Sequence, residues 1–253
     1  MKIAFIGQKA VPFYRDGGVE RHVEELATRL AARGHTVTVY VRPRYLATKE
    51  DIWRGVKIQR VFSIPTKHLD TITYTLFATL HAVLKRCQVS GVRCQGYDII
   101  HYHGVGPSLL AWIPRLFTSA KIVVTFHSID RFHAKWGPLS RLVLWAGEWT
   151  ATHFAHATIA VSHEIAKYCK KRFGKRVVYI PNSVEIKKIP ADNELTRWNL
   201  QKDKYIVTVA RLIRHKGIHY LIEAFKAVPD TIKKEFKLVI VGAPSYTRDY
   251  EKY

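Results

Sequence analysis

Two groups of residues in this sequence have the types and spacing that phosphate chemistry requires. The pair Gly17-Gly18 follows a short loop, and Arg211 and Lys216 lie in the string VARLIRHKG. Glycines let a backbone approach a ligand closely, while an arginine and a lysine can neutralise a phosphate group together. Taken alone, each pattern is also typical of an ordinary loop. From the residues alone, a solvated basic loop is the simpler interpretation of Arg211 and Lys216, whereas a flexible turn and an anion site are equally good interpretations of the glycine pair.

Histidines form a third group. His103, preceded by His101, follows the apolar run DIIHY, and His127 follows the apolar run KIVVTF. A hydrogen-bonded core histidine is the simpler interpretation of a lone histidine, whereas one at a strand end can enter a cleft. The three histidines could also bind a metal ion. No carboxylate or cysteine accompanies them at ligand spacing, so we expect no metal site.

The elements that must position these groups are short apolar strands alternating with amphipathic helices. Val19, Val23, Leu26 and Leu30 recur at helical spacing after the glycine pair, and Gly34 suits the end of that helix. Seven strands are predicted before residue 185: Lys2–Ile6, Thr36–Val41, Val56–Phe62, Asp98–Tyr102, Lys121–Phe126, Ala157–Val161 and Val177–Ile180. This alternation predicts an α/β fold with a parallel sheet and helices on both faces of that sheet. In such a fold, ligands bind beyond the carboxyl ends of the strands.

The pattern predicts three parts along the chain. Residues 1–184 form a Rossmann-like domain, residues 185–200 a polar linker, and residues 201–253 the start of a second Rossmann-like unit. That unit has predicted strands at Tyr205–Val209 and Phe236–Val241, with a helix from Gly217 between them. About fifty residues are few for a domain with its own core. We therefore expect a front portion of a longer protein, or a truncated product.

The opening strand, its loop and the string GGVERHVEELATRLAARGHTVTVY closely resemble the N-terminal signature of the family 4 glycosyltransferases, which have the GT-B fold. In that family the glycine pair lies beside the diphosphate of the donor and the acceptor. The string VARLIRHKG resembles the family motif whose arginine and lysine bind that diphosphate, which implies this role for Arg211 and Lys216. The string TFHS resembles the segment whose histidine supports transfer, so His127 is expected to be catalytic.

The resemblance implies a retaining glycosyltransferase that moves a hexose from a nucleotide sugar to a glycan or lipid-linked acceptor, without a metal or cofactor. His103 is expected on the acceptor side. The family's second domain also carries two glutamates eight positions apart, and nothing after Gly242 supplies them. The alternative is therefore an inactive chain that binds only an acceptor or an anionic membrane. A sugar-nucleotide epimerase of the same fold is a further alternative.

Composition sets the remaining bounds. The chain has 41 Lys+Arg against 20 Asp+Glu, a formal charge of +21, which favours polyanions. No nucleic-acid motif accompanies this charge, so nucleic acid is not the expected partner.

Three cysteines without zinc or disulfide spacing indicate a reducing, cytoplasmic setting. No signal peptide is visible, and the apolar stretch Thr71–Leu84 is too short to cross a bilayer. A peripheral position on the inner face of the membrane stays open, with the basic run Lys167–Arg176 and the Phe132–Trp149 segment as candidate contacts.

Overall fold

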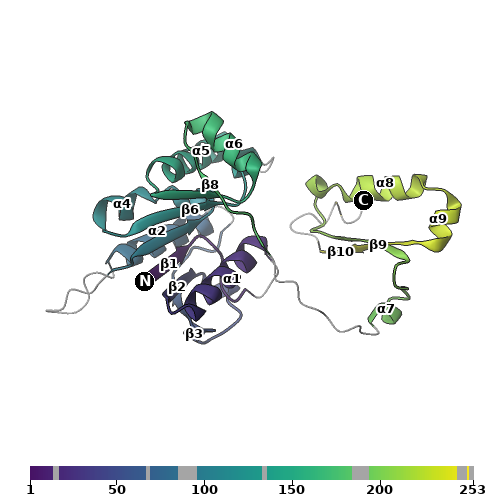
Figure 1. Ribbon diagram of the computed structural model, residues 1–253, viewed down its shortest axis with the longest axis horizontal. Helices are drawn as coiled ribbons and strands as arrows, with labels where there is room; N and C mark the ends of the chain where they lie inside the picture. Colours follow the sequence, from purple (N-terminus) through teal and green to yellow (C-terminus); the bar gives the residue numbers. More distant parts are fainter. Residues whose placement is uncertain are drawn as a thin grey trace. The chain divides into compact units, whose positions relative to one another are not determined.

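The computed structural model describes residues 1–13, 17–66, 69–84, 96–132, 136–183, 194–243 and 250. The chain divides into two units, Met1–Val184 and Glu185–Tyr253 (Figure 1). Cys87, Cys94 and the first residues of the predicted linker lie outside the described residues. The described end of that linker holds a short helix, α7 (Glu194–Arg197).

The first unit contains one large sheet of eight described strands. In chain order they are β1 (Lys2–Ile6), β2 (Thr36–Val41), β3 (Ile52–Trp53), β4 (Val56–Arg60), β5 (Ile99–His103), β6 (Lys121–Phe126), β7 (Ala157–Ala160) and β8 (Val178–Tyr179). Their order in the sheet is β3-β4-β2-β1-β5-β6-β7-β8. The seven predicted strands are all present within two residues of the predicted bounds.

The eighth strand, β3, was not predicted, and it adds an antiparallel edge to the otherwise parallel sheet. It pairs antiparallel with β4 through a two-residue turn, Arg54-Gly55, whose φ angles are +48° and +79°. Positive φ at both turn positions is the geometry that a tight hairpin needs. A two-residue strand leaves too short a pattern in the sequence for its alternation to be detected.

Helices pack around this sheet. They are α1 (Gly18–Ala32), α2 (Leu69–Leu84), α3 (Val105–Ser108), α4 (Trp112–Phe117), α5 (Pro138–His153) and α6 (His163–Phe173), with short 3-10 turns η1 (Pro43–Tyr45) and η3 (Asp130–Phe132). Ser162 caps α6 as expected, accepting a hydrogen bond from the Ile165 backbone N–H at 3.2 Å. Gly34, just after α1, has the expected positive φ of +82°.

The side chains of β1 point alternately to the two faces of the sheet, and each face has its own apolar core cluster. Ile3 and Phe5 are buried in a cluster with Val23 of α1, whereas Ala4 and Ile6 belong to the cluster that contains residues of α2 and α5. Successive side chains of a strand point to opposite faces. A strand buried on both faces is the arrangement expected of a parallel sheet covered by helices.

The second unit has a parallel pair of strands, β9 (Tyr205–Val209) and β10 (Lys237–Val241). Between them lie η4 (Arg214–Lys216), α8 (Ile218–Ala227) and α9 (Asp230–Glu235). Gly217 has a φ of +69° where η4 gives way to α8, so glycine suits this position. The strand, loop and helix predicted around VARLIRHKG are thus present.

The direction of winding in the large sheet changes at β1. This strand pairs with β2 on one side and with β5 on the other, both in parallel. At such a switch point the loops leave the carboxyl ends in opposite directions and open a crevice between them. The residues just after β1 and β5 are therefore the first place to look for a site.

Candidate functional site

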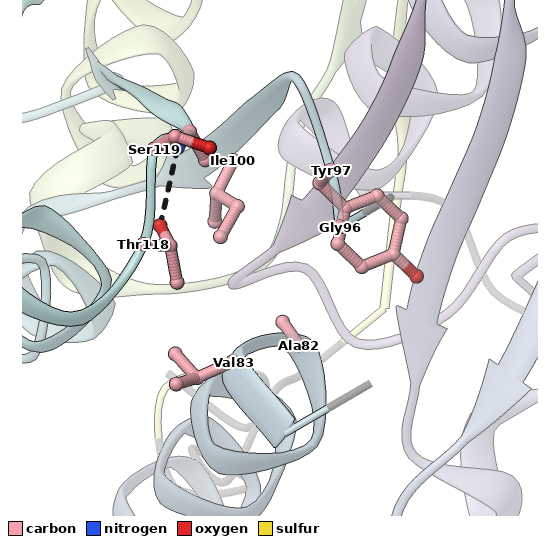
Figure 2. Close-up of a pocket in the computed structure, with 8 residues that line it drawn as sticks. Ala82, Val83, Gly96, Tyr97, Ile100, Thr118 and Ser119 are labelled. Atoms are coloured by element: carbon pink, nitrogen blue, oxygen red, sulfur yellow. Dashed lines mark hydrogen bonds between the residues drawn. The ribbon is translucent and has the colours of Figure 1, made fainter. Parts of the chain in front are cut away.

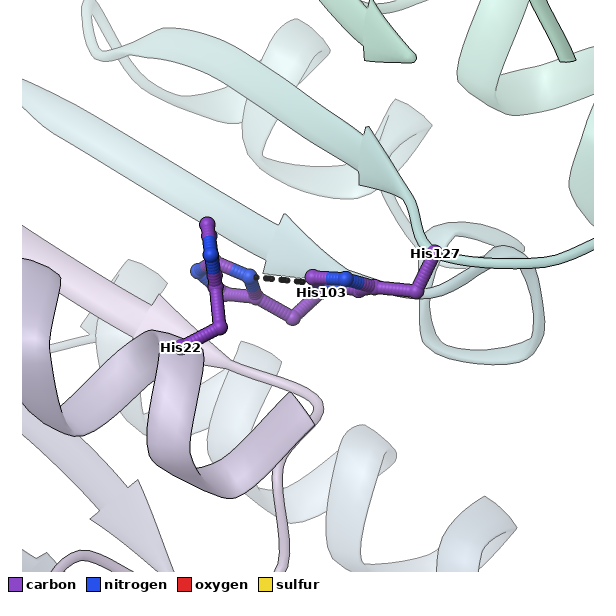
Figure 3. Close-up of side chains that lie close together, drawn as sticks. All are labelled: His22, His103 and His127. Atoms are coloured by element: carbon purple, nitrogen blue, oxygen red, sulfur yellow. Dashed lines mark hydrogen bonds between the residues drawn. The ribbon is translucent and has the colours of Figure 1, made fainter. Parts of the chain in front are cut away.

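Three histidines meet at the carboxyl ends of β5 and β6 (Figure 3). His103 is the last residue of β5, His127 follows β6, and His22 comes from α1. The Nδ1 of His103 lies 3.2 Å from the Nε2 of His127, a hydrogen-bonding distance, and the two rings stack with centroids 5.4 Å apart. The ring of His22 meets that of His127 edge-on at 5.0 Å. The structure thus brings His103 and His127 together and adds His22.

The local fold explains why His103 faces α1. His101 and His103 have the same parity along β5, and both rings pack against Phe5 at 5.3 and 5.2 Å, on the face that α1 covers. Side chains two residues apart share a face of the sheet. His22, on α1, can therefore approach His103 from above the same face.

Gly7, directly after β1, allows this close approach. Its φ is +125°, and a Cβ built on it would lie 2.3 Å from the backbone carbonyl oxygen of His103. Its N–H donates to the hydroxyl of Tyr74 at 3.1 Å, and that hydroxyl donates to the carbonyl of Tyr40 at 2.8 Å. The end of β1 and the end of β5 can touch here only because residue 7 has no side chain.

Burial keeps the imidazoles of this region uncharged. Burial, with a smaller contribution from His22 and His127, lowers the pKa of His101 to about 3. Burial, with a contribution from His22, lowers the pKa of His127 to about 4, and it lowers the pKa of His103 well below its usual range. At neutral pH each ring therefore carries one N–H donor and one acceptor nitrogen.

The stability of the chain is expected to fall as the pH drops from 7 to 5. An imidazole with a lowered pKa in the folded state binds fewer protons than in the unfolded state at any pH between that lowered pKa and about 6.5, so acidification favours unfolding. For His101 alone this loss is about 2 kcal/mol at pH 5. Urea unfolding at the two pH values measures it.

His101→Gln provides the matched variant, because glutamine takes up no proton in this range. The difference in unfolding free energy between pH 7 and pH 5 should shrink by about 2 kcal/mol in this variant. Equal stability of the original chain at both pH values would contradict the assigned burial of these rings.

The sequence offers His101, His103 and His127 as possible metal ligands. The structure instead groups His22 with His103 and His127. His101 Nε2 lies 2.7 Å from the Thr125 hydroxyl, which occupies it. The ligand nitrogens of His22, His103 and His127 lie within 4.8 Å of one another, so these three could hold a transition metal. Ligating histidines are normally oriented by a carboxylate or carbonyl on their other nitrogen. The Nε2 of His103 is buried with no hydrogen-bond partner among the described residues, and we keep the prediction of a site without metal.

The glycine pair lies at the start of α1, as predicted. Gly17 is the N-cap, and a Cβ built on Gly18 would meet no heavy atom of the described residues within 4 Å outside its chain neighbours and its own helix backbone. One carboxylate oxygen of Glu20 accepts from the Lys9 N–H at 3.3 Å, and its other oxygen lies next to Gly17. This carboxylate already balances part of the positive end of the helix.

Arg211 and Lys216 flank the loop between β9 and α8. Both side chains are exposed, and neither forms an ion pair within the part of the second unit that the structure describes. Arg211 follows β9 by two residues, and Lys216 is the last residue of η4. The two cations thus lie at the carboxyl end of a strand, where backbone and helix geometry favour a phosphate.

A second charged cluster lies at the end of β2. Arg42 and Arg44 both bind the same oxygen of Asp70, at 2.6 and 2.8 Å, and Ser63 donates to the other oxygen at 2.9 Å. Burial raises the pKa of Asp70, but the charge and hydrogen bond of Arg42 outweigh this effect, and the pKa is lowered. Two arginines share one carboxylate, so the cluster keeps a positive charge at this edge.

The cavity in Figure 2 is not part of this site. It lies between the end of α2 and the first residues of β5 and β6, at the amino ends of the parallel strands. Its volume of about 20 Å³ accommodates a single water molecule. The chemistry therefore has to be sought at the opposite, carboxyl edge.

Comparison with known proteins gives consistent results over both units. The family model described as Glycosyltransferase Family 4 matches residues 16–188, and the model described as Glycosyl transferases group 1 matches residues 192–253. A glycogen synthase of Mycobacterium tuberculosis is 26% identical over 229 residues, which cover 82% of this chain and 54% of that protein. The chain thus spans about half the length of this curated relative.

Solved structures show the fold. Sucrose-phosphate synthase from Thermosynechococcus elongatus has a TM-score of 0.73 at 20% identity, over 99% of this chain and 68% of that one. Anabaena HepE, solved in complex with UDP-glucose, has a TM-score of 0.68 at 19% identity, over 100% of this chain and 64% of that one. These neighbours have the GT-B fold, and the expected α/β fold class is confirmed.

Proposed function

Because this chain belongs to the family 4 glycosyltransferases, we propose that it transfers a hexose from a nucleotide sugar to an acceptor with retention of configuration. The observation that carries the proposal is the pair of uncharged histidines, His103 and His127, at the carboxyl ends of β5 and β6, next to the switch point at β1. Transfer without a metal or cofactor needs groups of this kind beside the reacting sugar. The alternative of a chain that binds only an acceptor or membrane is not favoured by the family matches.

We assign roles to the site residues on chemical grounds. The neutral ring of His127 donates a hydrogen bond to the reacting sugar, while His103, whose own ring is buried, holds the ring of His127 in place on the acceptor side. Arg211 and Lys216 neutralise the diphosphate as its charge develops, and Gly17 and Gly18 leave room for the donor. The UDP-glucose complex of HepE supports a nucleotide-sugar donor.

The acceptor in this proposal is a glycan or a lipid-linked molecule, and the location is cytoplasmic with a peripheral contact to the membrane. Among the described residues, no helix is both long and apolar enough to cross a bilayer. The basic composition supports contact with an anionic surface rather than with nucleic acid.

A nucleotide sugar is expected to raise the melting temperature of the 253-residue chain. A ligand at 100 times its Kd stabilises the native state by about 2.7 kcal/mol, which corresponds to about 5–10 °C for a chain of this size. Arg211→Ala and Lys216→Ala should remove most of the shift. Thermal melting with a panel of UDP-, ADP- and GDP-sugars measures it.

Arg214→Ala is the matched control, because Arg214 is an exposed cation in the same η4 turn. This variant should keep the shift. A shift of the same size with inorganic triphosphate would mean that the +21 charge binds any polyanion, and an unchanged shift in Arg211→Ala and Lys216→Ala would place the donor elsewhere.

A further inference from the structure

Three polar side chains form a closed network next to the loop that follows His127. Glu148, on α5, is completely buried. One of its carboxylate oxygens, Oε2, accepts a hydrogen bond from the Tyr168 hydroxyl at 2.7 Å and lies 3.7 Å from the Nε of Arg131. The Nη2 of Arg131 donates to the same hydroxyl at 2.6 Å. Each of the three side chains therefore contacts the other two.

The network joins three elements of the first unit. Arg131 belongs to η3 and comes four residues after His127, whereas Glu148 lies on α5 and Tyr168 on α6. Burial, together with the hydrogen bond and the charge of Glu148, raises the pKa of Tyr168 to about 12. The hydroxyl therefore keeps its proton at neutral pH and donates it to the carboxylate. The loop after β6 is thus attached to two helices a few residues beyond His127.

The helix α5 is also fixed to the chain that follows His103. A Cβ built on Gly147 would overlap the backbone carbonyl oxygen of Val105, two residues after His103, so α5 and α3 meet backbone against backbone. The Ser108 hydroxyl, at the end of α3, lies 2.9 Å from the Gly147 carbonyl oxygen. Glu148 is the next residue of the same helix. Consecutive residues of α5 therefore contact the segments that follow β5 and β6.

A gain in stability alone does not explain a carboxylate at this place. Burial raises the pKa of Glu148, which means that its surroundings disfavour the charged form. Its second oxygen, Oε1, is buried without a hydrogen-bond partner in the part of the chain that the structure describes. Apolar side chains of similar volume often stabilise a core at least as well as a buried ion pair does. Charge-assisted hydrogen bonds supply what an apolar contact lacks, a fixed direction between the groups they join.

We propose that this network positions His127. Glu148, Arg131 and Tyr168 hold the loop after β6 on α5, and α5 is itself fixed to the segment after His103. Together these contacts set the distance of 3.2 Å between the Nδ1 of His103 and the Nε2 of His127. The effect of the network on sugar transfer rests on the proposed function, whereas its effect on the histidine pair does not.

Histidine NMR tests the positioning without any sugar donor. In the 253-residue chain with isotopically labelled histidine, the ring signals of His103 and His127 are assigned with the alanine variant of each. Tyr168→Phe removes the hydroxyl and keeps the ring, and it should shift the ring signals of both histidines. Glu148→Ala should shift them further. Unchanged signals of His127 in the folded Tyr168→Phe variant would overturn the proposal.

Sugar transfer tests the consequence for the reaction. A displacement of about 1 Å at a reacting group can cost about 10²-fold in rate. Glu148→Ala should therefore lower kcat by about 100-fold and Tyr168→Phe by about tenfold, while the KM for the nucleotide sugar stays within about threefold. Glu148→Gln can still accept the hydrogen bond from Tyr168, so it should keep more of kcat than Glu148→Ala.

Thr158→Val is the matched control, because it also removes one buried hydroxyl that is hydrogen-bonded to α5. The Thr158 hydroxyl donates to the Ala151 carbonyl oxygen at 2.6 Å and is not part of the network. This variant should lower the melting temperature about as much as Tyr168→Phe does, but leave the histidine signals and kcat unchanged. Equal losses of kcat in the two variants would overturn the proposal. If the original chain transfers no sugar, the proposed function fails, and the histidine signals still decide whether the network positions His127.

Discussion

Replacing His127 with alanine is expected to slow sugar transfer by about 10²–10³-fold, the usual effect of removing one preorganised hydrogen-bond donor from an active site. Burial lowers the pKa of His127 to about 4, so its ring is neutral at pH 7 and can donate one hydrogen bond while it accepts another. His103 fixes the ring from 3.2 Å away. The release of nucleoside diphosphate in the presence of an acceptor measures the rate, which should show no inflection near pH 6.5.

His153→Ala is the control for this experiment. His153 is exposed on α5, where its ring stacks on Trp149 at 4.7 Å, and its removal should leave the rate unchanged. The His127 variant should keep the melting temperature and the donor affinity of the original chain within a few fold. A transfer rate within threefold of the original would remove His127 from the proposed mechanism.

The sequence predicted the strand ends well, because a parallel sheet brings its carboxyl ends to one edge. His103 and His127 end neighbouring runs in the sequence, and β5 and β6 are neighbours in the sheet, with His103 paired in register to Thr125. Their proximity follows from that topology. The family assignment is confirmed by the matches over both units, whereas the roles of the site residues remain predictions.

His22 was not predicted as a site residue because its role depends on how α1 crosses the sheet. In the sequence it follows the glycine pair closely on an amphipathic helix, a position usually read as surface. Only the packing of α1 on the face that contains Phe5 and His103 brings its ring within 5.7 Å of His103. The spacing of a helix predicts which residues share a face, but not which strand end that face will meet.

Gly7 was not predicted as a structural residue either, because its contact with β5 also depends on how the elements pack. Its replacement is expected to have a large effect on stability. Gly7→Ala is expected to destabilise the chain by about 2–5 kcal/mol, since it adds backbone strain at positive φ to overpacking against a rigid backbone. The new Cβ would lie 2.3 Å from the carbonyl oxygen of His103, and a backbone carbonyl at the end of a central strand cannot move aside as a flexible side chain does. Urea unfolding at pH 7 measures the loss.

Gly34→Ala separates the two causes. Gly34 has a φ of +82°, but a Cβ built on it would meet no heavy atom within 4 Å in the part of the chain that the structure describes. Alanine there should therefore cost only the backbone strain of about 1–2 kcal/mol. Equal losses for the two variants would mean that the contact with His103 carries no energy. If the Gly7 variant still folds, β5 has to shift at His103, and the His103–His127 pair shifts with it. Transfer should then fall in the Gly7 variant and stay unchanged in the Gly34 variant. Residue 7 contacts β5, the strand that positions His103, whereas a Cβ at Gly34 would contact no described residue of that strand.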